Sequence, residues 1–223
     1  TTFNRADHER RNGMDAAQLA DAIETEKQTE LDRLGSEKLL VAVTNANLGR
    51  ESVLRAVADS EYAAAETFDR WLEDESDEGL RDAFDAVRAQ ERSHYERVQS
   101  HLDSHSPPDD GGPMHAYLRG LEGSIERVAA GLLGRPLLST RTHLQVISYF
   151  VNEAEPRMAD LFRDLKAETD EEFDRGLRLL DDRCETEAEW ERAKASGGYV
   201  IQVAYDTYED ALFGLGIDPK PLC

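Results

Sequence analysis

Apolar residues recur at intervals of three, four and seven along almost the whole chain, and this spacing limits the possible fold more than any other feature. Residues at such intervals share one face of an α-helix, whereas a half-buried strand would alternate apolar and polar residues. No alternating run of Val, Ile and Thr long enough for a sheet interrupts the pattern. The chain of 223 residues is therefore predicted to be all-α.

Glycine, proline and short polar stretches divide this pattern into separate helices. The helices that we expect cover, in chain order, about residues 15–34, 36–48, 51–74, 79–102, 113–133, 137–167, 170–195 and 199–213. Gly134-Arg135-Pro136 and Ser196-Gly197-Gly198 are expected to form turns between helices, and Pro156 should kink its helix or restart it.

The long loop DSHSPPDDGGP separates two helical hairpins of similar length, 51–102 and 113–167, and could be the crossover of a bundle. We therefore predict a single helical domain with a four-helix core at 51–167. Residues 1–49 would add N-terminal helices, and residues 168–223 would add C-terminal helices and a tail. The apolar last helix is expected to pack against the N-terminal helices, with a homodimer interface as the alternative.

The charge of the chain is strongly negative, with 47 acidic and 26 basic residues and a formal net charge of -21. A dense carboxylate surface is typical of proteins from a salt-saturated cytoplasm, where salt screens the self-repulsion, so a halophilic source is expected. A nucleic-acid partner is not expected, because phosphate binding needs a basic patch and no Lys/Arg-rich run appears.

Neither a membrane anchor nor a disulfide framework is expected. No apolar run approaches the roughly 20 residues of a membrane helix. The N-terminal stretch TTFNRADHERRNG lacks the apolar core of a signal peptide, so a cytoplasmic location without a membrane partner is predicted. Cys184 and Cys223 are too few for a disulfide framework or a CxxC metal knuckle, and are expected to be unpaired thiols.

Three polar residues occupy positions where the apolar faces of two adjacent helices should lie. Glu61 stands seven residues from both Leu54 and Phe68, and on the next helix Glu91 and His94 stand seven residues after apolar positions. An unpaired buried carboxylate costs several kcal/mol, so these groups need a common partner, and a metal cation is the simplest one. The alternative is that Glu91 and His94 form surface hydrogen bonds, with Arg88 or Arg92 neutralising Glu91 at the edge of the bundle.

A Glu on one helix, about thirty residues before a Glu-x-x-His on its partner, resembles the first half of the ferritin-like di-iron carboxylate pattern, in its rubrerythrin-related branch. The resemblance covers about residues 51 to 165 and implies a ferritin-like four-helix bundle that carries a second such half. Glu122 is the matching candidate on the third helix, with Glu126 as its competitor. The fourth helix has no second Glu-x-x-His, although Glu153 could reach the flank of the core.

His143 shares the apolar stripe of the fourth helix, but it precedes Glu153 by ten residues, or about 15 Å of helix, which is too far to replace the missing imidazole. Three states of the site remain open. It could hold two metal ions with Glu153 as a ligand, or one ion bound by Glu61, Glu91, His94 and Glu122, or no metal.

The resemblance implies a non-haem iron-binding protein, with Mn or Zn as other possible ions, and an oxidoreductase activity on O₂ or peroxide. Two isolated cysteines exclude the four-cysteine rubredoxin-type iron site that rubrerythrins also carry, so the electron relay of that family is not transferred. The hypothesis from another class is a metal-free helical scaffold or interaction protein with a degenerate di-iron site.

Overall fold

The computed structural model describes residues 14–220. The N-terminal stretch that was compared with a signal peptide and Cys223 lie outside these residues. Within them the chain is all-α and contains no strand, as predicted. None of the described helices combines the length and the apolar character that crossing a membrane would require.

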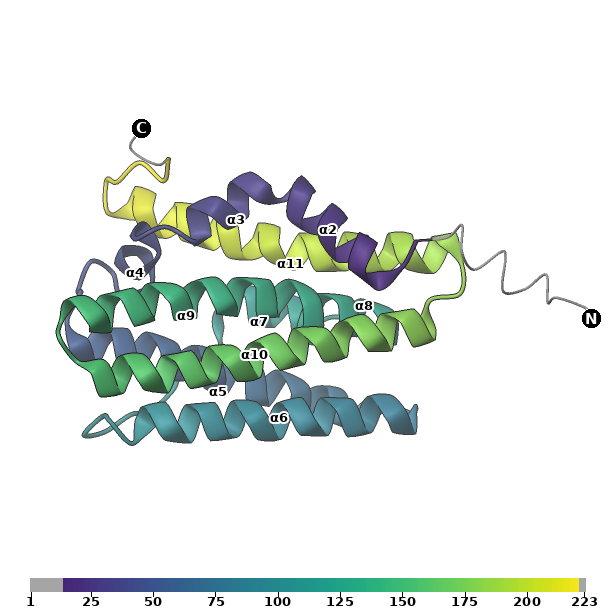
Figure 1. The fold of residues 1–223 in the computed structure, drawn as a ribbon, viewed down its shortest axis with the longest axis horizontal. Coiled ribbons are helices and arrows are strands. Elements are labelled where there is room, and N and C mark those ends of the chain that lie inside the picture. Colours follow the sequence, from purple (N-terminus) through teal and green to yellow (C-terminus); the bar gives the residue numbers. More distant parts are fainter. Residues whose placement is uncertain (1–13, 221–223) are drawn as a thin grey trace, which may run out of the picture.

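Two long antiparallel hairpins form the main body of the molecule (Figure 1). The first pairs α5 (Arg50–Asp74) with α6 (Glu78–Gln99), and the second pairs α9 (Arg135–Asn152) with α10 (Pro156–Arg183). The remaining elements are α2 (Ala16–Glu26), α3 (Gln28–Leu34), α4 (Lys38–Val43), α7 (Gly112–Arg119), α8 (Ser124–Ala129), the π-helix η2 (Ala130–Gly134) and α11 (Glu187–Gly214).

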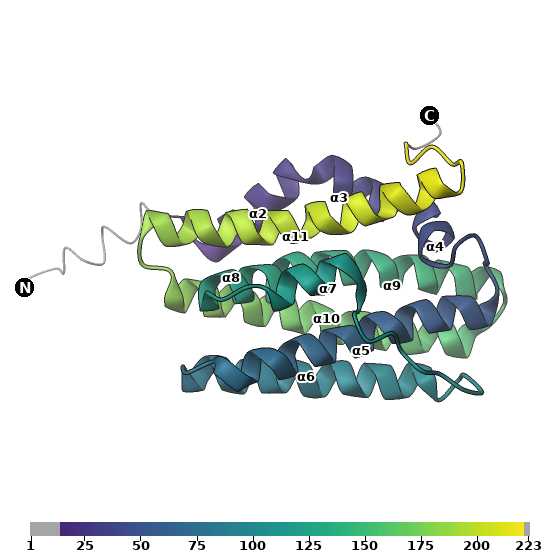
Figure 2. The same cartoon turned by 180° about the vertical axis from the view of Figure 1, so that it is seen from behind.

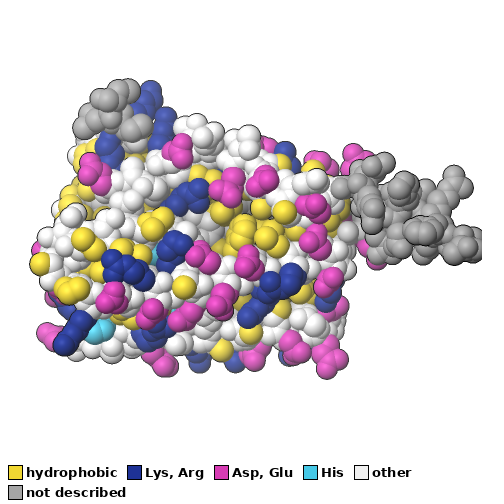
Figure 3. Space-filling view, viewed as in Figure 1, with side chains coloured by type: hydrophobic (Ala, Val, Ile, Leu, Met, Phe, Trp, Pro, Cys, Tyr) yellow, Lys and Arg dark blue, Asp and Glu magenta, His cyan; other side chains and the backbone are white. Residues whose placement is uncertain are grey.

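The last helix, α11, packs against the N-terminal helices α2, α3 and α4, which confirms the prediction for this segment. Figure 2 shows α11 lying along the body, with α2 and α3 against it and the short helices α7 and α8 below it. On the face drawn in Figure 3, acidic side chains are spread among basic and hydrophobic ones rather than gathered in one place.

The turn predicted at Gly134-Arg135-Pro136 is wrong, because the chain continues from α8 through the π-helix η2 into α9 without a break. Pro136 lies in the first turn of α9, directly after the π-helix η2, and the helix accommodates it there without ending. The expected helix at 113–133 is instead interrupted at residues 120–123, between α7 and α8, where Gly120 and Gly123 flank the break.

The break predicted at Ser196-Gly197-Gly198 is also wrong, because α11 runs straight through it. These glycines serve close packing rather than a turn. A Cβ on Gly197 would lie 2.9 Å from Cδ1 of Ile23, and a Cβ on Gly134 would lie 2.6 Å from the carbonyl O of Gly197. The missing side chains allow η2 and α11 to pack with their backbones almost in contact.

Pro156 restarts the helix, which was one of the two expected outcomes. The chain turns back between Asn152 and Pro156, with Ala154 at φ 57, so that α9 and α10 become antiparallel partners. As a result, the second hairpin is α9–α10 rather than residues 113–167, and α10 crosses the predicted boundary at residue 168. Thr186 and Glu189 then form a reciprocal capping box that begins α11.

Candidate metal centre

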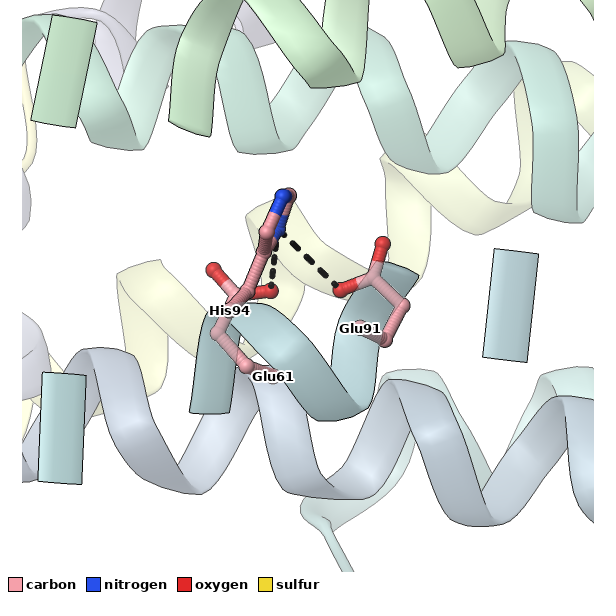
Figure 4. Close-up of side chains that lie close together, drawn as sticks. All are labelled: Glu61, Glu91 and His94. Carbon is pink, nitrogen blue, oxygen red and sulfur yellow. Dashed lines mark ion pairs between the residues drawn. The ribbon is translucent and has the colours of Figure 1, made fainter. Parts of the chain in front are cut away.

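Three of the five predicted site residues meet inside the molecule. Glu61 from α5 and both Glu91 and His94 from α6 offer ligand atoms that all lie within 4.8 Å of one another. Nδ1 of His94 is 3.7 Å from Oε2 of Glu61 and 3.9 Å from Oε2 of Glu91, as Figure 4 shows. The relative exposures are 5% for Glu61, 1% for Glu91 and 0% for His94, so solvent does not compensate these groups.

The helical spacing of the apolar stripes explains why these polar side chains point inward. On α5 the buried face continues on both sides of Glu61, from Leu54 and Ala58 to Ala65 and Phe68. On α6 the same holds for Glu91 and His94, whose face is completed by Phe84, Val87 and Val98. Because α5 and α6 are antiparallel neighbours, the two faces bring the three side chains to the same level of the hairpin.

A carboxylate from a third helix fixes the orientation of His94. Its Nε2 lies 2.8 Å from Oε2 of Glu168 on α10, while Nη1 of Arg97 donates to the other oxygen of Glu168 at 2.7 Å. Burial acts to lower the pKa of His94, but Glu61 and Glu168 outweigh it and raise that pKa above its usual value. In its neutral form, with Nε2–H donated to Glu168, His94 presents the Nδ1 lone pair to Glu61 and Glu91. Nδ1 is buried and has no hydrogen-bond partner.

Arg135 neutralises the other side of Glu91. Its guanidinium donates to Oε1 of Glu91 at 2.8 Å and to Oε1 of Glu172 at 2.5 Å, and all three side chains are almost completely buried. Arg135 follows directly after the π-helix η2, and its Nε donates to the carbonyl O of Gly131 within that turn. The site therefore contains a fixed protein cation beside Glu91.

His143 from α9 completes the contacts of Glu61. Its Nε2 lies 3.2 Å from Oε1 of Glu61, and the ring is 2% exposed. Since Glu61 can only accept when ionised, Nε2 carries the proton and Nδ1 of His143 is left without a partner. This contact joins α5 to α9 across the bundle.

The two carboxyl groups of the centre have opposite pKa shifts. Burial raises the pKa of Glu91 well above its usual value against the field of Arg135, and the neighbouring Glu61 and Glu172 raise it further. Burial also acts to raise the pKa of Glu61, but the close approach of Glu91, His143 and His94 outweighs it and holds that pKa well below its usual value. Without a cation, the pair therefore keeps a proton on Glu91.

The structure does not place the other two predicted residues, Glu122 and Glu153, in the centre, because both are exposed. Glu122 lies in the non-helical connection between α7 and α8, where the backbone no longer follows the helical period used to orient it. Glu153 caps the C-terminus of α9, since the helix ends at Asn152. The expectation that these two carboxylates face the core was wrong.

Sequence reasoning missed Arg135, Glu168 and Glu172, and had set His143 aside. Glu172 carried a usable signal, because it stands seven residues after buried Leu165 on one continuous helix. Arg135 carried one as well, as the single charge in the apolar run from Leu132 to Leu138. Both signals were hidden by the incorrect helix boundaries at 134–136 and 167.

Comparisons with protein-family models, with curated proteins and with solved structures found no match for this chain. The function has to be argued from the centre itself. Two carboxylate oxygens and one imidazole nitrogen converge there, a third carboxylate orients the imidazole, and Glu91 Oε2 and His94 Nδ1 are both buried without a partner.

Proposed function

We propose that this protein binds one divalent transition-metal ion through Glu61, Glu91 and His94. The observation that carries the proposal is the pair of unpartnered buried atoms, Oε2 of Glu91 and Nδ1 of His94, which face each other and Oε2 of Glu61. Buried polar atoms without partners are rare in native proteins and call for an explanation such as an ion.

The distances suit such an ion after a small contraction. Two ligand atoms that each lie about 2.1 Å from one ion at a tetrahedral angle are about 3.4 Å apart. The separations of 3.7 and 3.9 Å from His94 Nδ1 exceed this by a few tenths of an ångström, which side-chain rotation can supply. The contact between His94 and Glu168 supports the same reading, because metal-bound histidines usually donate their other N–H to a carboxylate or carbonyl.

The buried charges favour a single divalent ion. When Glu61, Glu91 and Glu172 are all ionised, their three negative charges exceed the positive charge of Arg135 by two. One divalent cation makes the buried group neutral. Because the guanidinium of Arg135 already lies between Glu91 and Glu172, a second ion on that side would meet a positive charge.

The donor set narrows the choice of metal. An imidazole nitrogen with two carboxylates suits Fe(II), Mn(II) and Zn(II), whereas Mg²⁺ and Ca²⁺ prefer oxygen ligands alone. We propose iron first, and a bound iron would supply redox chemistry such as the handling of O₂ or peroxide. Three protein ligands leave positions of the ion open to a small ligand.

We also propose a ferritin-like arrangement in which α5, α6, α9 and α10 correspond to the four helices of the bundle. The hairpin α5–α6 carries the Glu and the Glu-x-x-His of the first half. On the hairpin α9–α10, Arg135 and His143 take the place of the third-helix carboxylate, and Glu168 and Glu172 take the place of the second Glu-x-x-His. This substitution accounts for a centre with one ion instead of two.

The proposed function is tested by metal uptake. The full chain, purified in high salt and treated with a chelator, is loaded separately with Fe(II) under anaerobic conditions, Mn(II) and Zn(II), and its metal content is measured after desalting. We expect one ion per chain, and the matched variants are Glu61→Gln in the centre and Glu66→Gln on the outer face of the same helix. Glu61→Gln should weaken binding by about 100-fold or more, and Glu66→Gln should leave it unchanged.

Failure of all three metals to bind in stoichiometric amount would leave the metal-free scaffold as the function of this bundle. Equal losses in the two variants would show that the ion binds to surface carboxylates. Circular dichroism of both variants checks that the fold is retained.

The orienting carboxylate gives a second prediction for the same site. Replacing Glu168 with Ala removes the acceptor for Nε2–H of His94 without removing a ligand atom, so metal affinity should fall by about 10- to 100-fold. Competition with a chromogenic chelator measures this change. Asp164→Ala, one turn earlier on α10 and 3.9 Å from Arg97, is the control and should bind metal as the wild type does. An unchanged affinity in Glu168→Ala would contradict ligation through Nδ1 of His94.

A further inference from the structure

Each of the three side chains in the centre has two polar atoms, and a protein group holds one of them in every case. Glu61 and Glu91 are held through Oε1, and His94 is held through Nε2. The other three atoms face one another, since Nδ1 of His94 lies 3.7 and 3.9 Å from Oε2 of the two carboxylates. In Figure 4 one oxygen of each carboxylate is directed at the imidazole and the other is turned away from it. The centre therefore offers three single atoms rather than two whole carboxylate groups.

Arg135 holds the second oxygen of Glu91. Its guanidinium donates to Oε1 at 2.8 Å and is only 3% exposed. The guanidinium is itself fixed, because it also donates to Glu172 and to the carbonyl O of Gly131 in η2. An ion that took both oxygens of Glu91 would break this charge-assisted bond and would lie beside a buried positive charge. Glu91 is thus restricted to one oxygen.

His143 from α9 holds the second oxygen of Glu61. Its Nε2 donates to Oε1 at 3.2 Å, and the contact is buried, with side-chain exposures of 2% for His143 and 6% for Glu61. The other ring nitrogen, Nδ1, is buried without a hydrogen-bond partner, which costs free energy. The surroundings therefore do not explain a histidine at this position, whereas its contact with Glu61 does.

The number of atoms that a carboxylate gives to an ion helps to separate the metals. A carboxylate that binds through both oxygens raises the coordination number by one, and Mn(II) and Ca²⁺ are typically bound by six or more ligands, mostly oxygens. Zn(II) is four-coordinate in most protein sites, and an open site gives it three protein atoms and one small ligand. Two single oxygens and one imidazole nitrogen match the second pattern.

The next step rests on the proposed metal-binding function. We propose that the centre selects a four-coordinate ion, bound by one oxygen of each carboxylate, by Nδ1 of His94 and by one small ligand. His143 is the positioning residue that sets this number, because it keeps Oε1 of Glu61 away from the ion. Iron bound here would have the same protein ligands, and Mn(II) would fit less well than Zn(II).

Two substitutions of His143 separate its contact with Glu61 from its packing. Leucine fills much of the volume of the ring but donates no hydrogen bond, whereas the amide of glutamine places an N–H near the position of Nε2. The matched control is Leu144→Gln, at the neighbouring exposed position of α9. Competition with a chelator, at one pH and one high salt concentration, gives the dissociation constants of the full chain for Zn(II) and Mn(II).

The measured quantity is the ratio of the two dissociation constants, because most sites with nitrogen and oxygen ligands bind Zn(II) more tightly than Mn(II). We expect the preference for Zn(II) to fall by about tenfold or more in His143→Leu, since the released Oε1 of Glu61 adds a ligand atom that Mn(II) accepts more readily. His143→Gln and Leu144→Gln should keep the wild-type ratio. A role in packing alone would weaken both metals equally, and an unchanged ratio in His143→Leu therefore overturns the assignment of His143.

Co(II) reports the coordination number directly, because four-coordinate Co(II) absorbs visible light far more strongly than six-coordinate Co(II). The wild type and His143→Gln should give the strong spectrum, and His143→Leu a weaker one. A weak, six-coordinate spectrum of the wild type overturns the proposal even where His143→Leu does not fold. If no metal binds to the wild type, the proposed function and this inference fail together. Stoichiometric binding with a six-coordinate spectrum or an unchanged ratio refutes only the inference.

Discussion

Replacing Arg135 with Met is expected to lower the free energy of unfolding by about 3–5 kcal/mol in metal-free protein, because it leaves the buried carboxyl groups of Glu91 and Glu172 without the cation that they share. The guanidinium donates to Glu91 and to Glu172, which are 1% exposed and have no other cation at hydrogen-bonding distance among the described residues. Methionine keeps much of the side-chain volume, so the loss reports charge rather than a cavity. Urea denaturation in constant high salt measures it.

Arg163→Met is the matched control for this prediction. Arg163 pairs with Asp160 at an exposed position on α10, and its loss should change stability by no more than about 0.5 kcal/mol. The double variant Arg135→Met with Glu172→Gln removes a carboxylate together with the cation and should recover part of the stability. A single variant Arg135→Met as stable as the control would contradict the assignment of Arg135 as the counter-ion of the centre.

The sequence was sufficient to predict the fold class and half of the centre, because both depend on local periodicity. Glu61, Glu91 and His94 lie on α5 and α6, whose interiors contain no glycine or proline cluster, so residues seven apart share a face as expected. The structure shows only that these three side chains converge. Whether they bind a metal stays a prediction.

The other half of the centre could not be predicted, because its helices are continuous where the sequence suggests breaks. Gly134 and Gly197 allow η2 and α11 to approach closely. Because this contact joins segments far apart in the sequence, the local sequence cannot distinguish these glycines from glycines in a turn. A turn at residues 134–136 would leave Arg135 without a helical face, so the sequence does not predict that its side chain points inward. The π-helix before it also changes the helical phase, so a period of 3.6 residues cannot be carried from α8 into α9.

The structure also makes His115 a source of pH-dependent stability. Its pKa is lowered to about 3 in the folded protein, from its usual value of 6.5, because the ring is fully buried beside Arg135 and Arg119. At pH 7.5 the ring is neutral in both states and contributes no pH dependence. As the pH falls below 6.5 the unfolded state takes up a proton that the folded state cannot, so stability is progressively lost until the pH reaches the folded pKa near 3.

Between pH 7.5 and pH 4.5, the free energy of unfolding of the wild type should therefore fall by about 3 kcal/mol more than that of His115→Asn. One pKa unit corresponds to about 1.4 kcal/mol. The variant keeps a donor for Thr67 but has no titrating ring, so any packing defect lowers its stability equally at both pH values. Urea denaturation at each pH gives the difference, and the exposed His101→Asn should retain the wild-type pH dependence. Parallel stability curves for wild type and His115→Asn would show that the pKa of His115 is the same in the folded and the unfolded protein, and would contradict its neutral form in the core.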